Sequence, residues 1–173
     1  MQPTAAIVIV LGIDPGTAST GWGVVEQSGN KLASPGFGCV VTAAKDETPA
    51  RLRIIHAEIG AIIDRFRPTV VALEELFVSV NVKTALAVGQ ARGAIILAAA
   101  ERDLPCFDYT PVAVKQAVTG YGRAAKGQVQ EMTKALLGLP SIPQPDHAAD
   151  ALAVAICHAH ASSLLQSLQP RSR

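Results

Sequence analysis

Three strand-like segments open the chain, and alternating helices and strands follow them, which restricts the folds that this sequence can adopt. The expected strands are Ala6–Asp14, Gly21–Glu26 and Gly36–Thr42. The segments between them, Pro15–Thr20 and Gln27–Pro35, contain the glycine, serine and asparagine residues that are typical of hairpin loops. We therefore expect an antiparallel meander at the start of the sheet.

The remainder of the chain alternates between helical and strand-like patterns. Apolar residues recur at three- and four-residue steps from Thr48 to Arg67, with Pro49 in the first turn and Pro68 just beyond the end. The other expected elements are strands at Thr69–Leu73 and Pro105–Tyr109, and helices at Val82–Arg102, Val112–Val118, Lys126–Leu137 and Asp146 to about Leu165. This order predicts an α/β fold with a mixed five-stranded sheet flanked by helices, in which active sites gather beyond strand ends.

Length and composition indicate one folded domain. The chain has 173 residues, of which 49% are hydrophobic and 17% charged, so we expect a domain over residues 1–165 and a disordered tail over 166–173. The apolar runs Ile7–Leu11 and Ala94–Ala100 are too short to cross a bilayer, and the N-terminus lacks a secretory pattern. Three cysteines at no metal-ligand spacing are typical of reduced thiols, so we expect a cytoplasmic protein with no membrane partner.

Asp14 ends the most hydrophobic expected strand, in the stretch GIDPGTASTG. An ionised carboxylate there is costly to bury unless it is paired or binds a metal ion, although it could also be a capping residue before Pro15. Two of the glycines have the spacing of a phosphate-binding Walker A loop, but Trp22 stands where that motif needs lysine, which excludes it. The glycines instead predict a tight hairpin that leaves room beside Asp14 for a ligand.

Glu74 and Glu75 form a second acidic cluster at the end of the strand TVVAL. Side chains alternate across a strand, so only one of the pair can face Asp14, and the spacing does not decide which. A solvated acidic strand end is the alternative interpretation.

The segment PDHAADALA contains a third cluster at a helix start. Asp146 suits an N-cap, and His147 and Asp150 lie three residues apart on one helical face. The surrounding alanines are small enough to leave this face open to a ligand. An ordinary acidic first turn, which the helix dipole favours, is the alternative.

Together the three clusters indicate a site of hard oxygen ligands with one imidazole. Such a ligand set suits Mg²⁺ or Mn²⁺ better than zinc. Two such ions about 3.5–4 Å apart stabilise the attacking and leaving oxygens of a phosphoryl displacement. The sequence contains no serine or cysteine nucleophile motif, which fits attack by water.

Basic and aromatic side chains offer contacts to nucleic acid. The net charge is only +1, but Pro111–Ala135 carries four basic residues and one acid. These side chains could meet phosphates or form an ordinary solvated face, and the aromatic ones could stack on unpaired bases or pack in the core. The candidates are Lys115, Arg123, Lys126, Phe77 and Tyr121.

The expected helix Val82–Arg102 has an unusual surface of small residues. Gly89 and Gly93 lie four residues apart among alanines, where another element can approach closely. A helix this apolar could contact the sheet on one side and a second subunit on the other.

Five segments of the chain read GIDPGTASTGWGVV, ALEELF, GQARG, VKQAVTGYGRAAKGQVQ and PDHAADALAVAICH. In this order and without large gaps, from about Ile7 to about Ser163, they closely resemble the RuvC family of Holliday-junction resolvases. This resemblance implies a ribonuclease H-like fold, a homodimer, divalent metal ions and paired nicks in opposing strands of a four-way DNA junction. It also implies partnership with the RuvA/RuvB branch-migration complex and a nucleoid-associated place in the cytoplasm.

The resemblance also implies roles for single residues. By motif position, Asp14 matches the first catalytic acid, Glu74 the second, and His147 and Asp150 the helix-start pair, with His147 standing where some members have Asp. Asp146 lies one place earlier and could supplement the ligands, although capping already explains it. The family further implies DNA contacts near the junction centre for Phe77 and near the scissile strand for Lys115 and Lys126, whereas Tyr121 and Arg123 lie in a more variable loop.

Two functions other than nuclease activity each fit part of this sequence. An ATPase of the actin/Hsp70 group shares a first phosphate loop like GID-x-GT, but it needs two domains, which 173 residues cannot supply. A non-catalytic junction-binding scaffold would not need acids at all three places. We therefore expect a metal-dependent, structure-specific endonuclease that resolves Holliday junctions.

Overall fold

The structure is a computed structural model that describes residues 7–75 and 82–168 and contains a five-stranded sheet between two layers of helices. The strands are β1 (Val8–Asp14), β2 (Ser19–Ser28), β3 (Lys31–Val41), β4 (Val70–Glu74) and β5 (Cys106–Tyr109), in the spatial order β3-β2-β1-β4-β5. The first three strands pair antiparallel, and β4 and β5 are added parallel to β1. The expected mixed five-stranded sheet is confirmed.

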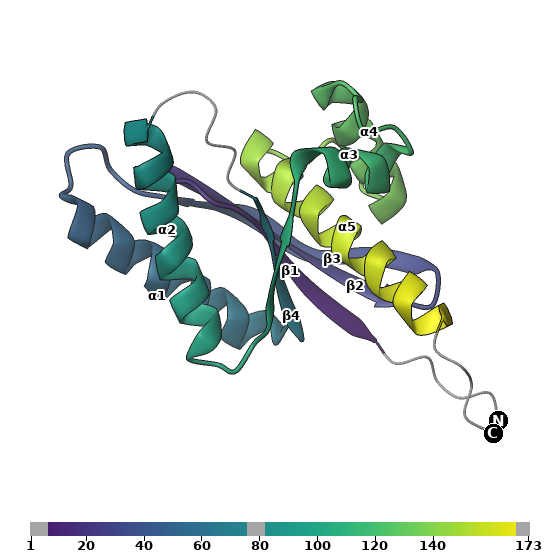
Figure 1. Ribbon diagram of the computed structural model, residues 1–173, viewed down its shortest axis with the longest axis horizontal. Helices are drawn as coiled ribbons and strands as arrows, with labels where there is room; N and C mark the ends of the chain where they lie inside the picture. The colour runs from purple at the N-terminus through teal and green to yellow at the C-terminus, as the bar shows by residue number, and fades with distance from the viewer. Residues whose placement is uncertain (1–6, 76–81, 169–173) are drawn as a thin grey trace.

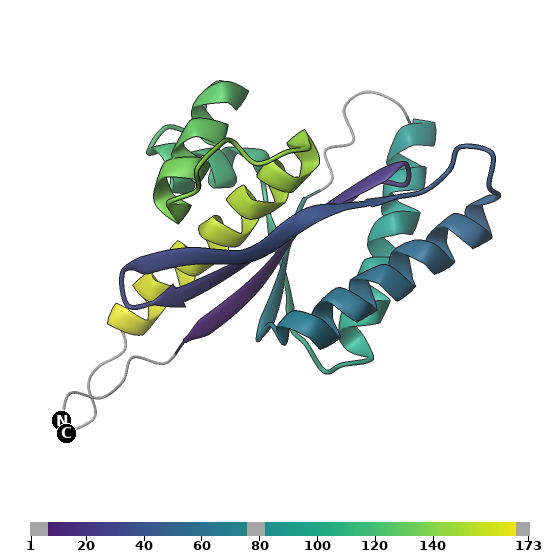
Figure 2. The same ribbon diagram turned by 180° about the vertical axis from the view of Figure 1, so that it is seen from behind.

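Helices cover both faces of this sheet (Figures 1 and 2). Helices α1 (Thr48–Phe66) and α2 (Val82–Ala100) pack together on one face. Helix α5 (Asp146–Leu168) lies on the other face, with α3 (Pro111–Thr119) and α4 (Lys126–Leu137) packed against it. Alternate residues of β1 enter the two cores, Val10 on the α5 side and Leu11 on the α1 side, which explains why this strand is apolar throughout.

The hairpin between β2 and β3 is longer than the sequence suggested. Residues 27–35 were expected to form a loop, but most of them pair, and only Gly29 and Asn30 connect the strands, with Gly29 at a φ of 59°. Pro35 misled the prediction because proline usually ends a strand. Here it lies in an edge strand, beside a shift of register between Val24 and Glu26 of β2, where its missing N–H breaks no ladder.

Helix α5 also continues beyond its expected end near Leu165, as far as Leu168. The sequence offers no helix-breaking residue before Pro170, so the last turn can form. The division into a single domain over residues 1–165 and a tail stays a prediction.

Close contact between α5 and the sheet accounts for the glycines of the first two strands. A Cβ on Gly12 would lie 2.0 Å from the carbonyl oxygen of Ala151, and one on Gly21 would lie 1.9 Å from that of His147. Ala148, Ala149, Ala151 and Ala153 of α5 are at most 2% exposed. The space beside Gly12 and Gly21 is thus filled by α5, whereas Ala153 lines the pocket that Glu74 and Asp150 border.

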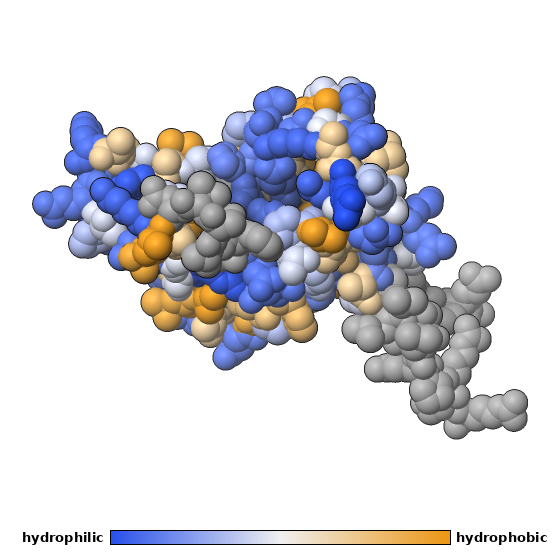
Figure 3. All heavy atoms as spheres, turned by 45° about the horizontal axis from the view of Figure 1, so that its top comes forward, coloured by the Kyte–Doolittle hydropathy of each residue, from blue (hydrophilic) through white to orange (hydrophobic). Residues whose placement is uncertain are grey.

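Helix α2 has one buried and one exposed apolar side. It is the one helix in the described parts of the chain that is long and apolar enough to cross a membrane, judged by length and composition alone, a test that core helices of soluble proteins also pass. Its buried residues are Ala91, Ile95, Ala98 and Ala99, whereas Val82, Leu86 and Leu97 are exposed. Figure 3 shows apolar side chains gathered over the end of the molecule where α1 and α2 lie.

Candidate active site

Three acids meet where the parallel strands β1 and β4 end and α5 begins. Asp14 is the last residue of β1, and Glu74 is the last residue of β4. The register pairs Ile13 with Leu73, so these two acids follow neighbouring positions at the same edge of the sheet. The contact of Gly21 with His147 holds the first turn of α5 over this edge and brings Asp150 to it.

Donor atoms of Asp14, His147 and Asp150 are close enough to share one metal ion, and Glu74 lies outside this group of three. His147 Nδ1 lies 2.6 Å from Asp14 Oδ2. One ligand atom from each of Asp14, His147 and Asp150 lies within 4.8 Å of the others. Carboxylate oxygens with one imidazole nitrogen suit Mg²⁺ or Mn²⁺, so the residues present fit a divalent ion.

Glu74 and not Glu75 faces this cluster. The carboxyl of Glu74 lines the same pocket as Asp150, whereas Glu75 is exposed, and its backbone N–H donates to the carbonyl of Tyr109. Burial raises the pKa of Glu74 to about 7, helped by the charges of Asp14 and Asp150, and Lys126 acts in the opposite direction. Burial also raises the pKa of Asp14, against the hydrogen bond from His147.

The raised pKa values of Glu74 and Asp14 have a common physical cause. Several carboxyl groups are held close together and partly out of water, an arrangement that is unfavourable until positive charge is added. A divalent cation would supply that charge.

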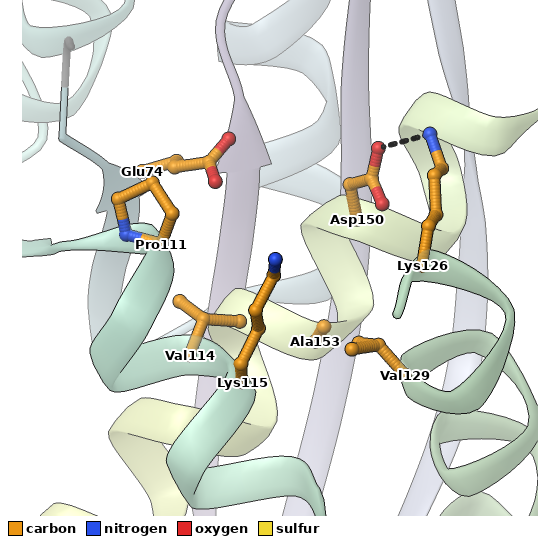
Figure 4. A pocket seen from close by; sticks show the side chains of 8 residues that line it. All are labelled: Glu74, Pro111, Val114, Lys115, Lys126, Val129, Asp150 and Ala153. Carbon is orange, nitrogen blue, oxygen red and sulfur yellow. Dashed lines mark hydrogen bonds and ion pairs between the residues drawn. The ribbon is translucent and has the colours of Figure 1, made fainter. Parts of the chain in front are cut away.

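Two lysines border the acids in a pocket of about 200 Å³. Figure 4 shows the carboxyl groups of Glu74 and Asp150 on opposite sides of the pocket, with the ammonium of Lys115 between them. Lys126 Nζ donates to Asp150 Oδ2 over 3.0 Å. The full lining is Glu74, Pro111, Val114, Lys115, Lys126, Val129, Asp150 and Ala153.

Asp146 lies beside this cluster and outside the group that can share an ion. Its carboxylate is 3.3 Å from Lys126 Nζ and accepts a hydrogen bond from Gln130 over 3.2 Å. The bond from Lys126 lowers the pKa of Asp146. Its partners are thus side chains of α4, a role that sequence reasoning missed because helix spacing does not show which helix lies opposite.

Two of the remaining candidates for DNA contact, Tyr121 and Arg123, do not line this pocket. Tyr121 is 59% exposed and borders a separate hollow of about 360 Å³, together with Gln128 and Met132 of α4. Arg123 is exposed in the same loop. Phe77 lies outside the described residues.

Comparisons with known proteins agree on one family. The family model described as "Crossover junction endodeoxyribonuclease RuvC" matches residues 10–158. The protein of that name from Desulfitobacterium hafniense is 53% identical over 161 residues, which are 93% of this chain and 98% of the relative. The relative from Pelotomaculum thermopropionicum is 54% identical over 153 residues, covering 88% of this chain and 93% of its own.

Solved structures show the same likeness. Thermus thermophilus RuvC in complex with Holliday junction substrate is 40% identical, with a TM-score of 0.87, and the match covers 91% of this chain and 96% of that one. The yeast mitochondrial Holliday junction resolvase is 14% identical, with a TM-score of 0.69 over 96% of this chain and 84% of its own, which supports the fold alone. The expected ribonuclease H-like fold is thus confirmed. Because the family model spans most of the chain and relatives are more than half identical over nearly its full length, this chain belongs to the RuvC family of crossover junction endodeoxyribonucleases.

Proposed function

We propose that this protein resolves four-way DNA junctions by cutting two opposing strands, with Asp14, Glu74, His147 and Asp150 as its catalytic and metal-binding residues. The observation that carries the proposal is the convergence of Asp14, His147 and Asp150 within 4.8 Å, beside the raised pKa of Glu74. Two divalent ions, Mg²⁺ or Mn²⁺, would be held by these four side chains. When bound, such ions polarise the phosphate, orient it and make water a better nucleophile.

The hydrogen bond to Asp14 decides which ring nitrogen of a neutral His147 carries the proton. An ionised Asp14 can only accept a hydrogen bond, so Nδ1 of His147 must carry the proton that joins them. In the neutral ring Nε2 then has a free lone pair, which can bind a metal ion or accept a proton from the attacking water. Asp14 thereby fixes the tautomer of His147.

The two pocket lysines would bind the phosphates of the scissile strand. Lys115 and Lys126 place positive charge on the same pocket as the acids, as a polyanionic substrate needs. Tyr121 and Arg123 would make further junction contacts outside this pocket, and Phe77 would contact DNA near the junction centre.

Paired cuts require two equivalent sites. A four-way junction has approximate two-fold symmetry, and a homodimer with C2 symmetry presents two like sites to strands of like polarity. The exposed apolar side of α2, formed by Val82, Leu86 and Leu97, is the surface that we assign to the second copy. The RuvA/RuvB complex would supply the junction in the cytoplasm, at the nucleoid.

The phosphate-binding part of this proposal is tested by the salt dependence of junction binding in EDTA. Replacing Lys115 by Gln should reduce the slope of log affinity against log salt by about 1. The matched control is Lys134→Gln, since that lysine pairs with Glu131 within α4 and does not line the pocket. Equal slopes for wild type and Lys115→Gln would remove Lys115 from the interface.

A further inference from the structure

Arg92 is a largely buried cation in the apolar helix α2 that reaches the strand ends beside the candidate active site. Its side chain is 16% exposed. One guanidinium nitrogen donates to the backbone carbonyl of Glu74 over 3.3 Å, and another donates to the carboxylate of Asp108. Arg92 thus joins α2 to two neighbouring strands, because Glu74 ends β4 and Asp108 lies in β5.

Helix packing alone does not require a charged side chain at this position. Burying a guanidinium is costly unless its N–H groups are all directed to acceptors. The planar fork of arginine can serve a carbonyl and a carboxylate together, which a lysine point charge does less well. The residue type therefore matches the two acceptors it contacts.

The carbonyl that Arg92 holds belongs to the residue whose side chain faces the acidic cluster. In a strand, the direction of the carbonyl and that of the side chain are coupled, so holding one restrains the other. The next peptide is also fixed, because Glu75 N–H donates to Tyr109 O over 2.8 Å.

We propose that Arg92 is a positioning residue for Glu74: it holds the end of β4 so that the Glu74 carboxylate stays directed at Asp14, and Asp108 orients the guanidinium. The proposal rests on the proposed function for the role of Glu74. Arg92 touches neither substrate nor metal and acts only through the strand end.

The test compares Arg92→Gln with Arg102→Gln in the full chain. Arg102 is a matched control, since it is also a partly buried arginine paired with an aspartate, Asp64, but it donates to the carbonyl of Ala98 and contacts no site residue. We expect Arg92→Gln to weaken Mn²⁺ binding, measured by calorimetry, and to slow single-turnover junction cleavage, each by about 10-fold or more. Junction affinity in EDTA should stay within about twofold of wild type for both variants, because neither arginine lies in the pocket.

A purely structural role for Arg92 would give a different result. In that case both variants would lower the melting temperature while leaving Mn²⁺ affinity at the wild-type value, and the proposal would be overturned. Conversion to Lys should restore part of the Mn²⁺ affinity, because one donor to the Glu74 carbonyl remains available.

A second variant and a measurement without DNA allow the proposal to be tested even if Arg92→Gln does not fold or the protein cuts no junction. If Arg92→Gln does not fold, Asp108→Asn keeps the guanidinium but removes its orienting charge, and it should weaken Mn²⁺ binding by about two- to fivefold. Unchanged Mn²⁺ binding in Asp108→Asn and Arg92→Lys would then contradict the proposal. Mn²⁺ affinity is measured without DNA, so a wild-type protein that binds Mn²⁺ but cuts no junction refutes the proposed function and leaves the positioning test intact.

Discussion

Asp14, the last residue of an otherwise apolar strand, has a different environment from that of an ordinary turn residue. Its side chain is 15% exposed, and burial raises its pKa although His147 hydrogen-bonds to it. An acid kept this dry among other acids is unfavourable for the free protein, which is typical of a site built for a cation. The buried carboxylate of Asp14 is therefore unfavourable for the metal-free fold and suited to binding a cation.

The substitution Asp14→Asn tests whether the Asp14 carboxylate binds the metal ion. We expect single-turnover junction cleavage to fall by about 10³-fold or more, because the amide is a poor ligand and carries no charge. Junction affinity in EDTA should persist, since the pocket lysines remain. Asp103→Asn is the control, an exposed aspartate in the left-handed region that asparagine tolerates, and it should cut normally. Wild-type cleavage by Asp14→Asn would refute the site.

From the raised pKa of Glu74 we predict that the stability of the metal-free protein depends on pH. The Glu74 pKa is about 7 in the fold against an ordinary value of 4.5, so the folded state binds this proton more tightly than the unfolded state. Stability should therefore fall as the pH rises from 4.5 to 7 and stay low above that range.

Urea unfolding of Glu74→Gln in EDTA measures this effect. The variant should exceed wild type by about 1–2 kcal/mol at pH 8, a figure reduced for the partial exposure of Glu74, and by much less at pH 5. Glu75→Gln, the exposed neighbour, should show no such difference between the two pH values. A gain for Glu74→Gln that is equal at both pH values would show that its charge is not the cause.

Among the secondary-structure elements, the placement of α5 on β1 and β2 decides where the site forms. The sequence was sufficient to predict these elements, because apolar periodicity reports the burial of each segment. It was not sufficient to interpret Gly12 and Gly21, because close approach between two elements far apart in the chain leaves no local pattern. The same limit left Glu74 and Glu75 undecided by spacing, and only the family motif favoured Glu74.

Gly12→Ala tests the contact between α5 and β1. The added methyl would meet the backbone of Ala151, which cannot rotate away, so we expect a loss of about 2–3 kcal/mol in the free energy of unfolding. Gly127→Ala is the matched change in open space within α4, and it should be neutral or stabilising by about 0.5–1 kcal/mol. Denaturant unfolding distinguishes the two, and equal stability of both variants would contradict the proposed packing.

Considered as a whole, the molecule has two separate surfaces that the proposed function uses. The acidic pocket lies between β4, α3, α4 and α5, and the exposed apolar side of α2 lies on the helix that packs with α1 on the other sheet face. Sequence reasoning could suggest a second-subunit contact from the apolar character of α2. It could not show which side chains remain exposed, because that depends on how α2 rests on α1.

Leu97→Glu should weaken the proposed homodimer. A buried carboxylate without a partner is strongly unfavourable in an apolar interface, so the variant should sediment as a monomer at concentrations where wild type is dimeric. Val112→Glu, which changes an exposed valine of α3, should leave the oligomeric state unchanged. A dimeric Leu97→Glu protein would exclude this side of α2 as the interface.

The central claim is paired, metal-dependent cutting of a four-way junction by the site of Asp14, Glu74, His147 and Asp150. The direct measurement uses a synthetic junction labelled on each strand in turn, beside a linear duplex of the same sequence, with Mg²⁺, Mn²⁺ or EDTA. We expect nicks at symmetric positions in two opposing strands with either ion, no cleavage in EDTA, and little or no cleavage of the linear duplex. Equal cleavage of duplex and junction, or undiminished cleavage in EDTA, would contradict it.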